Sequence, residues 1–246
     1  MSLFTKLFKK QGMQQVEPLL VDMHSHLLPG LDDGAQNLEE SLVLVRNLVE
    51  LGYKKLIMTP HIMGDFYKNS EETIRPAFEK LSKAVMEEGL TIQLAFAAEY
   101  YLDEWFMKKL DDNEPLLTFG NNNILVETSY MNRPNNLDEL LFKLQSKGYK
   151  PIIAHPERYV YLYADFEEYK KIYEKGVLYQ VNINSLTGYY SPRAKKIAEK
   201  LIKNNMVELL GTDCHTLKHI GVLKKARQTS LYKKALSQSL LNNTLL

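Results

Sequence analysis

The feature that most constrains this chain is a regular alternation of short apolar runs with helical patterns. Most of the apolar runs are unbroken, which is typical of parallel strands covered on both faces. Seven strand-like stretches lie at residues 19–26, 54–61, 91–101, 123–130, 150–158, 178–185 and 207–215. About seven β-then-α units in a chain of 246 residues predict an α/β barrel with irregular closure. A doubly wound open sheet is the alternative.

The helix expected between the first two strands has a beginning, an apolar face and an end. Its apolar stripe consists of Leu38, Leu42, Val45 and Val49. Asn37 and Glu40 resemble a capping box before this stripe, and Gly52 supplies a stop after it. Further helices are expected at 135–148, 166–176 and 191–205. Since no linker or repeat divides the chain, we expect one domain over residues 19–246 after an extension at 1–18.

The overall charge and the cysteine content exclude several classes of protein. The formal net charge of +1 does not indicate a protein that binds nucleic acid. One cysteine excludes an intrachain disulfide framework and fits a reducing compartment, so we expect a cytoplasmic protein. No apolar run approaches the roughly 20 residues of a membrane helix. Residues 1–12 are basic and mildly amphipathic, which allows peripheral contact with an anionic membrane, although a frayed terminus is the simpler interpretation.

Histidine and carboxylate side chains gather where the expected strands end. His24 and His26 are one residue apart and point to the same face if the chain is extended there. The other candidates at or after strand ends are Asp33, His61, Glu99, Glu127, His155, Asp213 and His215. Because the carboxyl ends of barrel strands meet at one mouth, these side chains are expected to converge there. A single such residue would be explained by ordinary hydrogen bonding, but nine of them indicate a multinuclear metal site.

The residue types constrain which ions could bind. Nine ligands are too many for one tetrahedral ion, and a bridging carboxylate would let them hold two or three. Imidazole and carboxylate ligands without thiolate suit manganese best, with iron or zinc possible, rather than Cu(I) or calcium. Cys214 lies between Asp213 and His215, and strand alternation points its side chain to the opposite face. We therefore expect Cys214 to pack in the core.

The ordered set of motifs resembles the PHP (polymerase and histidinol phosphatase) superfamily. The segments that carry the resemblance are "DMHSHLLPGLDDG", "TPH", "AAEYY", "LVETSY", "AHPERY", "QVNINSLTGYY" and "GTDCH". Within the superfamily the chain resembles the protein-tyrosine phosphatases of bacterial capsule and exopolysaccharide loci, from about residue 19 to about residue 223. The resemblance implies a distorted (β/α)7 barrel of the PHP type.

The resemblance also assigns roles to residues. It implies that His24, His26, Glu99 and Asp213 hold one ion and that Glu99 bridges to a second ion. It implies that Glu127 and His155 complete the second site and that Asp33, His61 and His215 hold a third ion. Arg158 matches the arginine that reaches the substrate phosphate, so Arg158, His155 and Asp33 are the expected catalytic residues. Asp22 and Asp32 are expected to orient the ligand imidazoles.

One part of the family pattern is missing. Many members carry an arginine a few residues after the last ligand histidine, where this chain has Lys218 and His219. Either side chain could face the phosphate, but lysine does not reproduce a bidentate guanidinium clamp. Further substrate contacts are expected from Tyr101 and Asn184, with Asn182 on the same strand face as Asn184. Tyr100, Trp105, Tyr189 and Tyr190 could add an aromatic rim.

These residues predict hydrolysis of a phosphomonoester through a metal-bound hydroxide, without a covalent intermediate. A cysteine-dependent mechanism is excluded because residue 220, six positions after Cys214, is isoleucine rather than arginine. The resemblance implies a phosphotyrosine protein as substrate, namely the tail of a bacterial tyrosine kinase that controls polysaccharide export. Two alternatives are a small-molecule phosphatase of the histidinol-phosphatase type, in which His219 could act as the acid, and a non-catalytic metal-bound scaffold. The complete ligand set argues against the scaffold.

Overall fold

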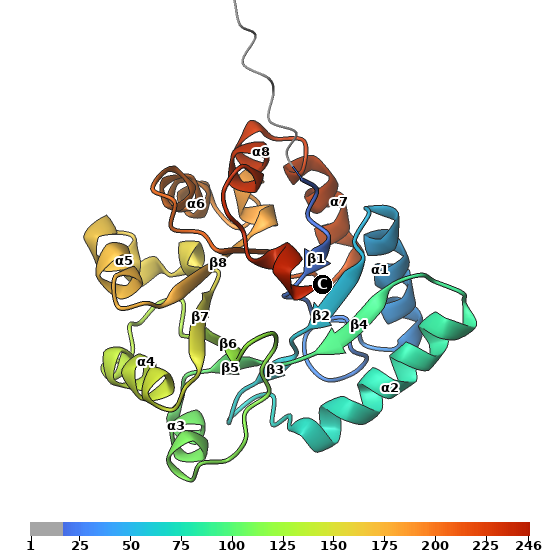
Figure 1. Cartoon of the computed structure of the whole chain (residues 1–246), viewed down its shortest axis with the longest axis horizontal. Helices are drawn as coiled ribbons and strands as arrows, with labels where there is room; N and C mark the ends of the chain where they lie inside the picture. Colours follow the sequence, from blue (N-terminus) through green and yellow to red (C-terminus); the bar gives the residue numbers. More distant parts are fainter. Residues whose placement is uncertain (1–16) are drawn as a thin grey trace, which may run out of the picture.

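The computed structural model describes residues 17–246, which form a strongly curled parallel sheet surrounded by helices (Figure 1). The strands are β1 (Val21–Asp22), β2 (Lys55–Met58), β3 (His61–Ile62), β4 (Gln93–Phe96), β5 (Glu99–Tyr101), β6 (Asn123–Glu127), β7 (Lys150–Ala154), β8 (Leu178–Asn182) and β9 (Leu209–Gly211). Their hydrogen-bonded orders are β1-β2-β4 and β3-β5-β6-β7-β8-β9. All the strand pairs are parallel, as the unbroken apolar runs predicted.

The two groups of strands continue into each other. Only two residues separate β2 from β3, and two separate β4 from β5. Backbone hydrogen bonds bridge both interruptions, because the Ala97 N–H donates to Met58 and the Glu99 N–H donates to Pro60. At the other edge, Ser25 pairs with Cys214 in a parallel bridge, which joins the first strand segment to the last. The sheet therefore curls far enough for its two edges to meet.

Helices cover the outside of this sheet (Figure 1). They are α1 (Leu38–Glu50), α2 (Glu71–Glu87), α3 (Glu104–Asp111), α4 (Leu137–Ser146), α5 (Phe166–Tyr173), α6 (Pro192–Lys203), α7 (Leu217–Ala226) and α8 (Ser230–Leu236). Short 3₁₀ helices lie at η1 (Pro156–Arg158), η2 (Val160–Leu162), η3 (Ile183–Thr187) and η4 (Asn242–Leu245). None of the helices in the described range is both long enough and apolar enough to cross a bilayer.

The expected first helix is confirmed at both ends. The Asn37 side chain accepts a hydrogen bond from the Glu40 N–H at 3.0 Å, which caps α1. The Glu40 carboxylate accepts from the Gln36 N–H, so the reciprocal bond is made one residue before the capping residue. Gly52 follows the last turn with φ of +92°, a conformation that favours glycine. The expected α4, α5 and α6 are also present, whereas α2, α3, α7 and α8 were not predicted.

Buried apolar side chains form two clusters on opposite faces of the sheet. The larger one joins the strands to the surrounding helices. The smaller one contains no residue of an α-helix and therefore lies on the inner, concave face. It consists of Val21, Met23, Ile57, Ala97, Phe119, Leu125, Ile152, Ala154, Leu209 and Leu245. Cys214 belongs to the larger cluster and is 1% exposed, so the prediction that it packs in the core is confirmed.

The amino ends of the strands are closed by the last residues of the chain. Asn242 donates through Nδ2 to the carbonyls of Val21 and Leu210 and accepts through Oδ1 from the Leu210 N–H, at 2.7–3.0 Å. Leu245 packs in the inner cluster, and a Cβ on Gly120 would lie 2.7 Å from its side chain. We refer to this region as the closed end.

The α/β class with a curled parallel sheet is as expected. The count of seven β/α units remains a prediction, because the strands are interrupted. Of the expected extension at 1–18, residues 1–16 and the basic segment within them lie outside the described residues.

Candidate metal centre

The predicted ligands converge at the carboxyl ends of the strands. They form four overlapping groups whose ligand atoms lie within 4.8 Å of one another. The groups are His26–Asp33–His61–His215, His24–His26–Asp213, His24–Glu99–His155 and His61–Glu99–Glu127. All nine candidate residues appear in at least one group, so the structure brings the whole predicted set together.

Strand alternation explains how most of these side chains reach the interior. Ala97 lies in the inner apolar cluster, and Glu99 is two residues further along the chain, at the start of β5. In the same way, Glu127 follows Leu125 on β6, and Asp213 follows Leu209 by four residues. The inner face of each strand is therefore apolar near the closed end and acidic near its carboxyl end.

His155 departs from this alternation, and its backbone explains why. Ala154 already faces inward, so an extended His155 would point outward. Instead His155 has φ of +34° and ψ of +53°, which turns the chain at the end of β7. Asp213 also has a positive φ, of +48°, and the other non-glycine residues with positive φ in the described part of the chain are asparagines. Left-handed backbone costs of order 1–3 kcal/mol and is concentrated at functional sites.

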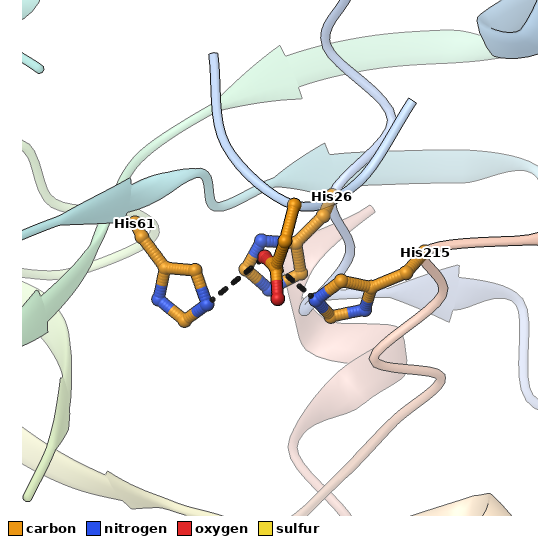
Figure 2. A group of neighbouring side chains, drawn as sticks. His26, His61 and His215 are labelled. Carbon is orange, nitrogen blue, oxygen red and sulfur yellow. Dashed lines mark ion pairs between the residues drawn. The ribbon is translucent and has the colours of Figure 1, made fainter. Parts of the chain in front are cut away.

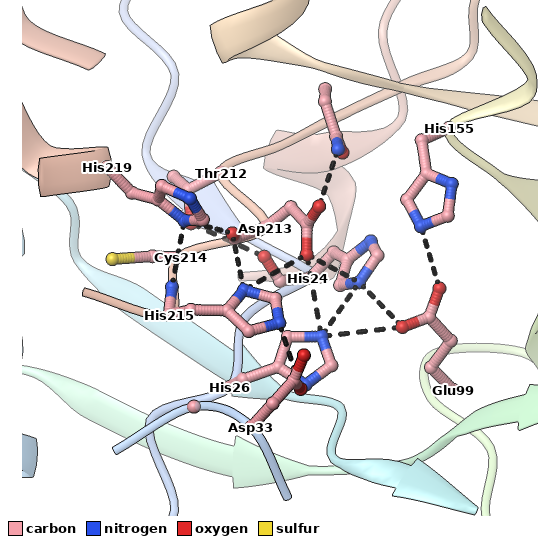
Figure 3. Close-up of polar contacts among 12 residues, drawn as sticks. His24, His26, Asp33, Glu99, His155, Thr212, Asp213, Cys214, His215 and His219 are labelled. Atoms are coloured by element: carbon pink, nitrogen blue, oxygen red, sulfur yellow. Dashed lines mark hydrogen bonds and ion pairs between the residues drawn. The ribbon is translucent and has the colours of Figure 1, made fainter. Parts of the chain in front are cut away.

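Glu99 lies at the centre of the cluster. Its Oε2 is 3.1 Å from His24 Nε2 and 3.4 Å from His26 Nε2, whereas its Oε1 is 3.0 Å from His155 Nε2 (Figure 3). His61 Nδ1 also approaches Glu99 Oε2, at 3.3 Å, and Glu127 Oε1, at 3.0 Å. The two oxygens of this one carboxylate therefore face different groups of ligands.

Asp33 joins the outer part of the cluster. Its Oδ1 lies 3.5 Å from His61 Nε2 and 3.3 Å from His215 Nε2. His26 belongs to the same group, and Figure 2 shows the three histidines together. The Asp33 side chain is 55% exposed, in contrast to the fully buried Glu99. This group is therefore the one closest to solvent.

Neighbouring oxygens fix the protonation of three imidazoles. His24 Nδ1 donates to Gln180 Oε1 at 2.8 Å, His26 Nδ1 to Asp32 Oδ2 at 2.7 Å, and His215 Nδ1 to the Asp213 carbonyl at 2.9 Å. Because each Nδ1 carries the proton, the Nε2 lone pair of a neutral ring faces the cluster. His24 Nε2 and His26 Nε2 lie 3.2 Å apart, so their lone pairs repel each other unless a proton or a metal ion lies between them.

Tests of the donor set favour metal ions at this cluster. Among the described residues, Glu99 Oε1, His61 Nδ1 and His155 Nδ1 are buried without a hydrogen-bond partner. Unsatisfied buried polar atoms are unusual and call for an explanation such as an ion. Gly34 and Gly211 keep the supporting contacts tight, since a Cβ there would lie 2.1 Å from the His26 carbonyl oxygen and 2.6 Å from Gln180 Nε2, respectively. The residues present fit divalent metal ions.

The electrostatics of the cluster also favour positive charge. Burial opposes protonation of His26, but Asp32 and Glu99 outweigh it and raise the pKa of His26 well above its usual range. Burial and His26 lower the pKa of His61, whereas Glu99 and Glu127 raise it more strongly, to about 9. The carboxylate centre therefore holds a proton or a cation tightly.

The predictions of which residues orient the ligand imidazoles are only partly correct. Asp32 binds His26 as predicted, and its Oδ2 also accepts the His61 N–H at 3.0 Å. The prediction for Asp22 is wrong, because its two oxygens accept from the Thr212 N–H and hydroxyl rather than from an imidazole. Gln180, which the sequence did not single out for this role, orients His24. Its only signal was its position two residues before Asn182 on the same strand.

A cavity of about 800 Å³ opens above the cluster. Arg158 lines it, with its guanidinium 4.5 Å from the Tyr130 ring centre and 4.2 Å from that of Tyr190. Arg158 Nη1 also donates to Asp213 Oδ2 at 3.0 Å. The aromatic rings and the carboxylate hold the guanidinium beside the ligand cluster, where an anion could meet it.

Of the other predicted substrate contacts, some line the cavity and others are buried away from it. Lys218, His219, Tyr101, Tyr189 and Tyr190 line the cavity. Asn184 does not, because it is fully buried and its Nδ2 donates to the His219 carbonyl at 3.2 Å. Asn182 is also buried, and it donates to Asp213 Oδ2 at 2.6 Å.

The aromatic rim differs from the prediction. Tyr100 packs in the core and its hydroxyl accepts from the Leu117 N–H, and Trp105 packs against the core. Tyr67 and Tyr130 line the cavity instead, and sequence reasoning missed both of them. They lie in loops after β3 and β6, where side-chain direction does not follow alternation.

Comparisons with known proteins agree with this geometry. Residues 20–240 match the sequence model of the CpsB/CapC family of capsular polysaccharide synthesis. The tyrosine-protein phosphatase YwqE of Bacillus subtilis is 29% identical over 199 residues, covering 81% of this chain and 78% of that protein. The putative tyrosine-protein phosphatase CapC of Staphylococcus aureus is 24% identical over 230 residues, covering 92% and 90%.

Solved structures show the same relationship. A crystal structure from work on YwqE of Bacillus subtilis and CpsB of Streptococcus pneumoniae, described as unique metal-dependent tyrosine phosphatases, superposes with a TM-score of 0.81 at 27% identity. It covers 92% of this chain and 94% of that chain. A histidinol phosphate phosphatase of Lactococcus lactis has a TM-score of 0.52 at 15% identity, over 85% of this chain and 94% of that chain, which shows a shared fold.

Proposed function

The chain belongs to the CpsB/CapC family, and we propose that it is a metal-dependent protein-tyrosine phosphatase that acts in capsular or exopolysaccharide synthesis. The observation that carries the proposal is the convergence of nine imidazole and carboxylate side chains beneath a cavity lined by Arg158. A cationic cluster and a guanidinium together can neutralise the charge on the oxygens of a phosphate ester. The relatives named as tyrosine phosphatases supply the class of substrate.

We propose that the ligands hold up to three ions, an assignment that many of the distances support. We assign one ion to His24, His26, Glu99 and Asp213, because each histidine Nε2 lies 3.1–3.5 Å from oxygens of both carboxylates. Glu99 Oε1 would reach a second ion with Glu127 and His155. Asp33, His61 and His215 would hold a third. Manganese suits this mixture of nitrogen and oxygen ligands, and iron or zinc are the alternatives.

Bound divalent ions would supply a Lewis acid and a water of lowered pKa. The protein supplies the position of the substrate. Arg158 is placed to bind phosphate oxygens, since Tyr130 and Tyr190 prevent it from moving sideways and Asp213 orients one of its nitrogens. His155 and Asp33 would contribute to catalysis by helping to hold the ions. Lys218 adds a second positive charge at the cavity wall.

His219 is positioned as a hydrogen-bond donor. His219 Nδ1 lies 3.1 Å from the His215 N–H and 3.0 Å from the Asp213 carbonyl oxygen, so this nitrogen is engaged by backbone groups and Nε2 is left free. Burial and the neighbouring His215 lower the pKa of His219, which favours a neutral ring. A tautomer with the proton on Nε2 would donate to a phosphate oxygen where many family members have arginine. A phenolate leaving group, with a conjugate acid of pKa about 10, requires little further protonation.

The surroundings of the cavity suit a polypeptide substrate. Phe66, Met131 and Leu217 are 77%, 63% and 55% exposed, and they lie in segments that flank the cavity. Exposed apolar side chains around a polar site mark surfaces that bind other proteins. We propose that the substrate is the tyrosine-containing tail of a bacterial tyrosine kinase and that the protein works in the cytoplasm.

We also propose that β2 and β3, and likewise β4 and β5, are interrupted halves of single strands. On this interpretation residues 19–246 form one phosphatase domain, a distorted barrel of seven β/α units. The backbone hydrogen bonds that bridge both interruptions support it.

Turnover of phosphotyrosine peptides tests this function. We expect hydrolysis that is lost in protein stripped by a chelator and restored by Mn²⁺. Histidinol phosphate, assayed in parallel, is expected to have a much lower kcat/KM. Equal turnover by the stripped protein, or a strong preference for the small ester, would overturn the proposal.

A further inference from the structure

Positive charge is concentrated at one end of the sequence. Residues 192–246 contain eleven lysines and arginines against three acidic residues, a net charge of +8. The preceding 191 residues contain 20 basic and 27 acidic side chains, a net charge of −7. The overall charge of +1 therefore conceals two oppositely charged parts of one molecule.

This excess lies on the outer surfaces of adjacent helices. α6, α8 and α7 follow one another around the sheet (Figure 1), and α6 packs against α8. We call the following exposed residues the basic wall: Lys195 and Lys200 on α6, Lys224 and Lys225 on α7, and Lys233 and Lys234 on α8. Glu199 lies among the lysines of α6 and pairs with Lys203, one turn away.

Across residues 17–246, the six lysines of the basic wall have no partner carboxylates, although Lys203 on α6 pairs with Glu199. On α2 and α5, for example, Lys83, Lys170 and Lys171 each pair with a glutamate one turn away. Within the described residues, none of the six lysines of the basic wall has a carboxylate within 4 Å. A surface of unpaired like charges is costly unless an anionic partner covers it.

We infer that the basic wall binds the surface of an anionic lipid membrane. Its cations are lysines spread over three convex helices, which suits diffuse attraction to many lipid phosphates. A folded acidic partner would be recognised better by arginine forks in a groove. The amino-terminal sequence fits as well, since Lys6, Lys9 and Lys10 accompany Phe4 and Phe8.

A contact near the first described residue also supports membrane binding by the basic wall. The Pro18 carbonyl accepts a hydrogen bond from Asn243, in the segment that follows α8. The start of the described chain is thus tied to the segment that follows α8, the last helix of the basic wall. The basic wall covers the outside of the sheet. A membrane bound to it would therefore leave the cavity at the carboxyl ends of the strands open to a substrate. Membrane attachment would concentrate the phosphatase where an exported polysaccharide is made.

Co-sedimentation of the full-length protein with vesicles tests this inference. We expect binding to phosphatidylcholine vesicles that contain phosphatidylglycerol, and none to phosphatidylcholine alone. Because the attraction is electrostatic, affinity should fall at least tenfold between about 0.05 and about 0.5 M salt. No binding to the anionic vesicles at low salt would overturn the inference, as would equal binding to both kinds of vesicle.

Charge-reversal variants identify the surface. Lys195→Glu, Lys225→Glu, Lys233→Glu and Lys234→Glu in one protein should weaken vesicle binding about 100-fold or more. The matched control is Lys80→Glu and Lys83→Glu on α2, Lys108→Glu on α3 and Lys147→Glu just after α4, which changes the net charge equally and should lose less than about tenfold. An equal loss in both variants would show that net charge alone acts and would contradict the basic wall.

A third variant separates the wall from the amino-terminal segment. Lys6→Glu, Lys9→Glu and Lys10→Glu should leave at least part of the binding, and total loss in this variant with full binding in the wall variant would overturn the inference. Hydrolysis of p-nitrophenyl phosphate serves as the folding control for all variants. Vesicle binding is measured without substrate, so failure of the proposed phosphatase activity would leave this test intact.

Discussion

Among the described residues, buried polar groups have hydrogen-bond partners at one end of the curled sheet and lack some of them at the other end. At the closed end, Asn242 makes three hydrogen bonds and satisfies its entire side chain except for one lone pair. At the carboxyl end, Glu99 and His61 keep buried atoms without hydrogen bonds, and His24 Nε2 and His26 Nε2 face each other at 3.2 Å. The same strands supply both regions, so the difference reflects function rather than fold: the closed end is complete, whereas the carboxyl end would be completed by ions.

The largest expected effect comes from Glu99→Gln at the carboxyl end. The variant keeps the size of the side chain and removes the charge that faces two groups of ligands. We expect kcat/KM for a phosphotyrosine peptide to fall about 1,000-fold or more, at saturating Mn²⁺. An unchanged thermal unfolding midpoint would show that the loss is local. A loss below about tenfold would contradict the central position of Glu99.

Arg158→Lys is expected to have the next largest effect. Lysine keeps the positive charge but loses the planar fork that lies between Tyr130 and Tyr190. We expect kcat/KM to fall about 10- to 100-fold, with metal content unchanged. Steady-state kinetics together with metal analysis checks both parts. If the variant lost its ions as well, Arg158 would act on the ligand cluster through Asp213 rather than on the substrate.

Gln180→Leu tests the support beneath the cluster. The substitution removes the oxygen that holds the proton on His24 Nδ1, while the ligands themselves stay in place. Loss of such a partner typically weakens metal affinity 10- to 100-fold. Activity titrated with Mn²⁺ should therefore recover at higher concentrations of the ion. Recovery at the wild-type concentration would show that His24 does not depend on Gln180.

Protons should compete with the metal at the carboxyl end. The pKa of His61 is raised to about 9, and that of His26 is raised well above its usual range, by neighbouring carboxylates that outweigh burial. These rings therefore hold protons at neutral pH, and an ion must displace them. Metal affinity should rise with pH between about 6 and about 9, and calorimetry in buffers of different ionisation enthalpy should detect proton release. Affinity independent of pH would contradict these shifts.

Asn242→Ala should produce the smallest effect on activity and a clear effect on stability. It leaves the buried Val21 and Leu210 carbonyls without their side-chain donor. We expect the free energy of unfolding to fall by about 1–3 kcal/mol, with kcat/KM unchanged at a temperature where the variant is folded. Chemical denaturation measures the first quantity. A large loss of activity would show that the two ends are coupled.

The sequence predicted the carboxyl end better than the closed end, for a physical reason. A strand end is marked locally by a polar residue after an apolar run, and alternation then gives the direction of Glu99, Glu127 and Asp213. The contacts of Asn242 and Gln180 join residues far apart in the chain, and no local pattern marks them. α2 was missed because Pro76 lies inside it and reads as a break. His155 reaches the cluster only through its left-handed backbone, which the sequence does not reveal.

Anomalous diffraction from crystals grown with Mn²⁺ tests the central claim most directly. We predict two or three manganese peaks within the cluster, with Glu99 between two of them and with His24, His155 and Asp33 each beside a peak. Peaks only elsewhere on the molecule, or an active enzyme whose cluster contains no peak, would contradict the account.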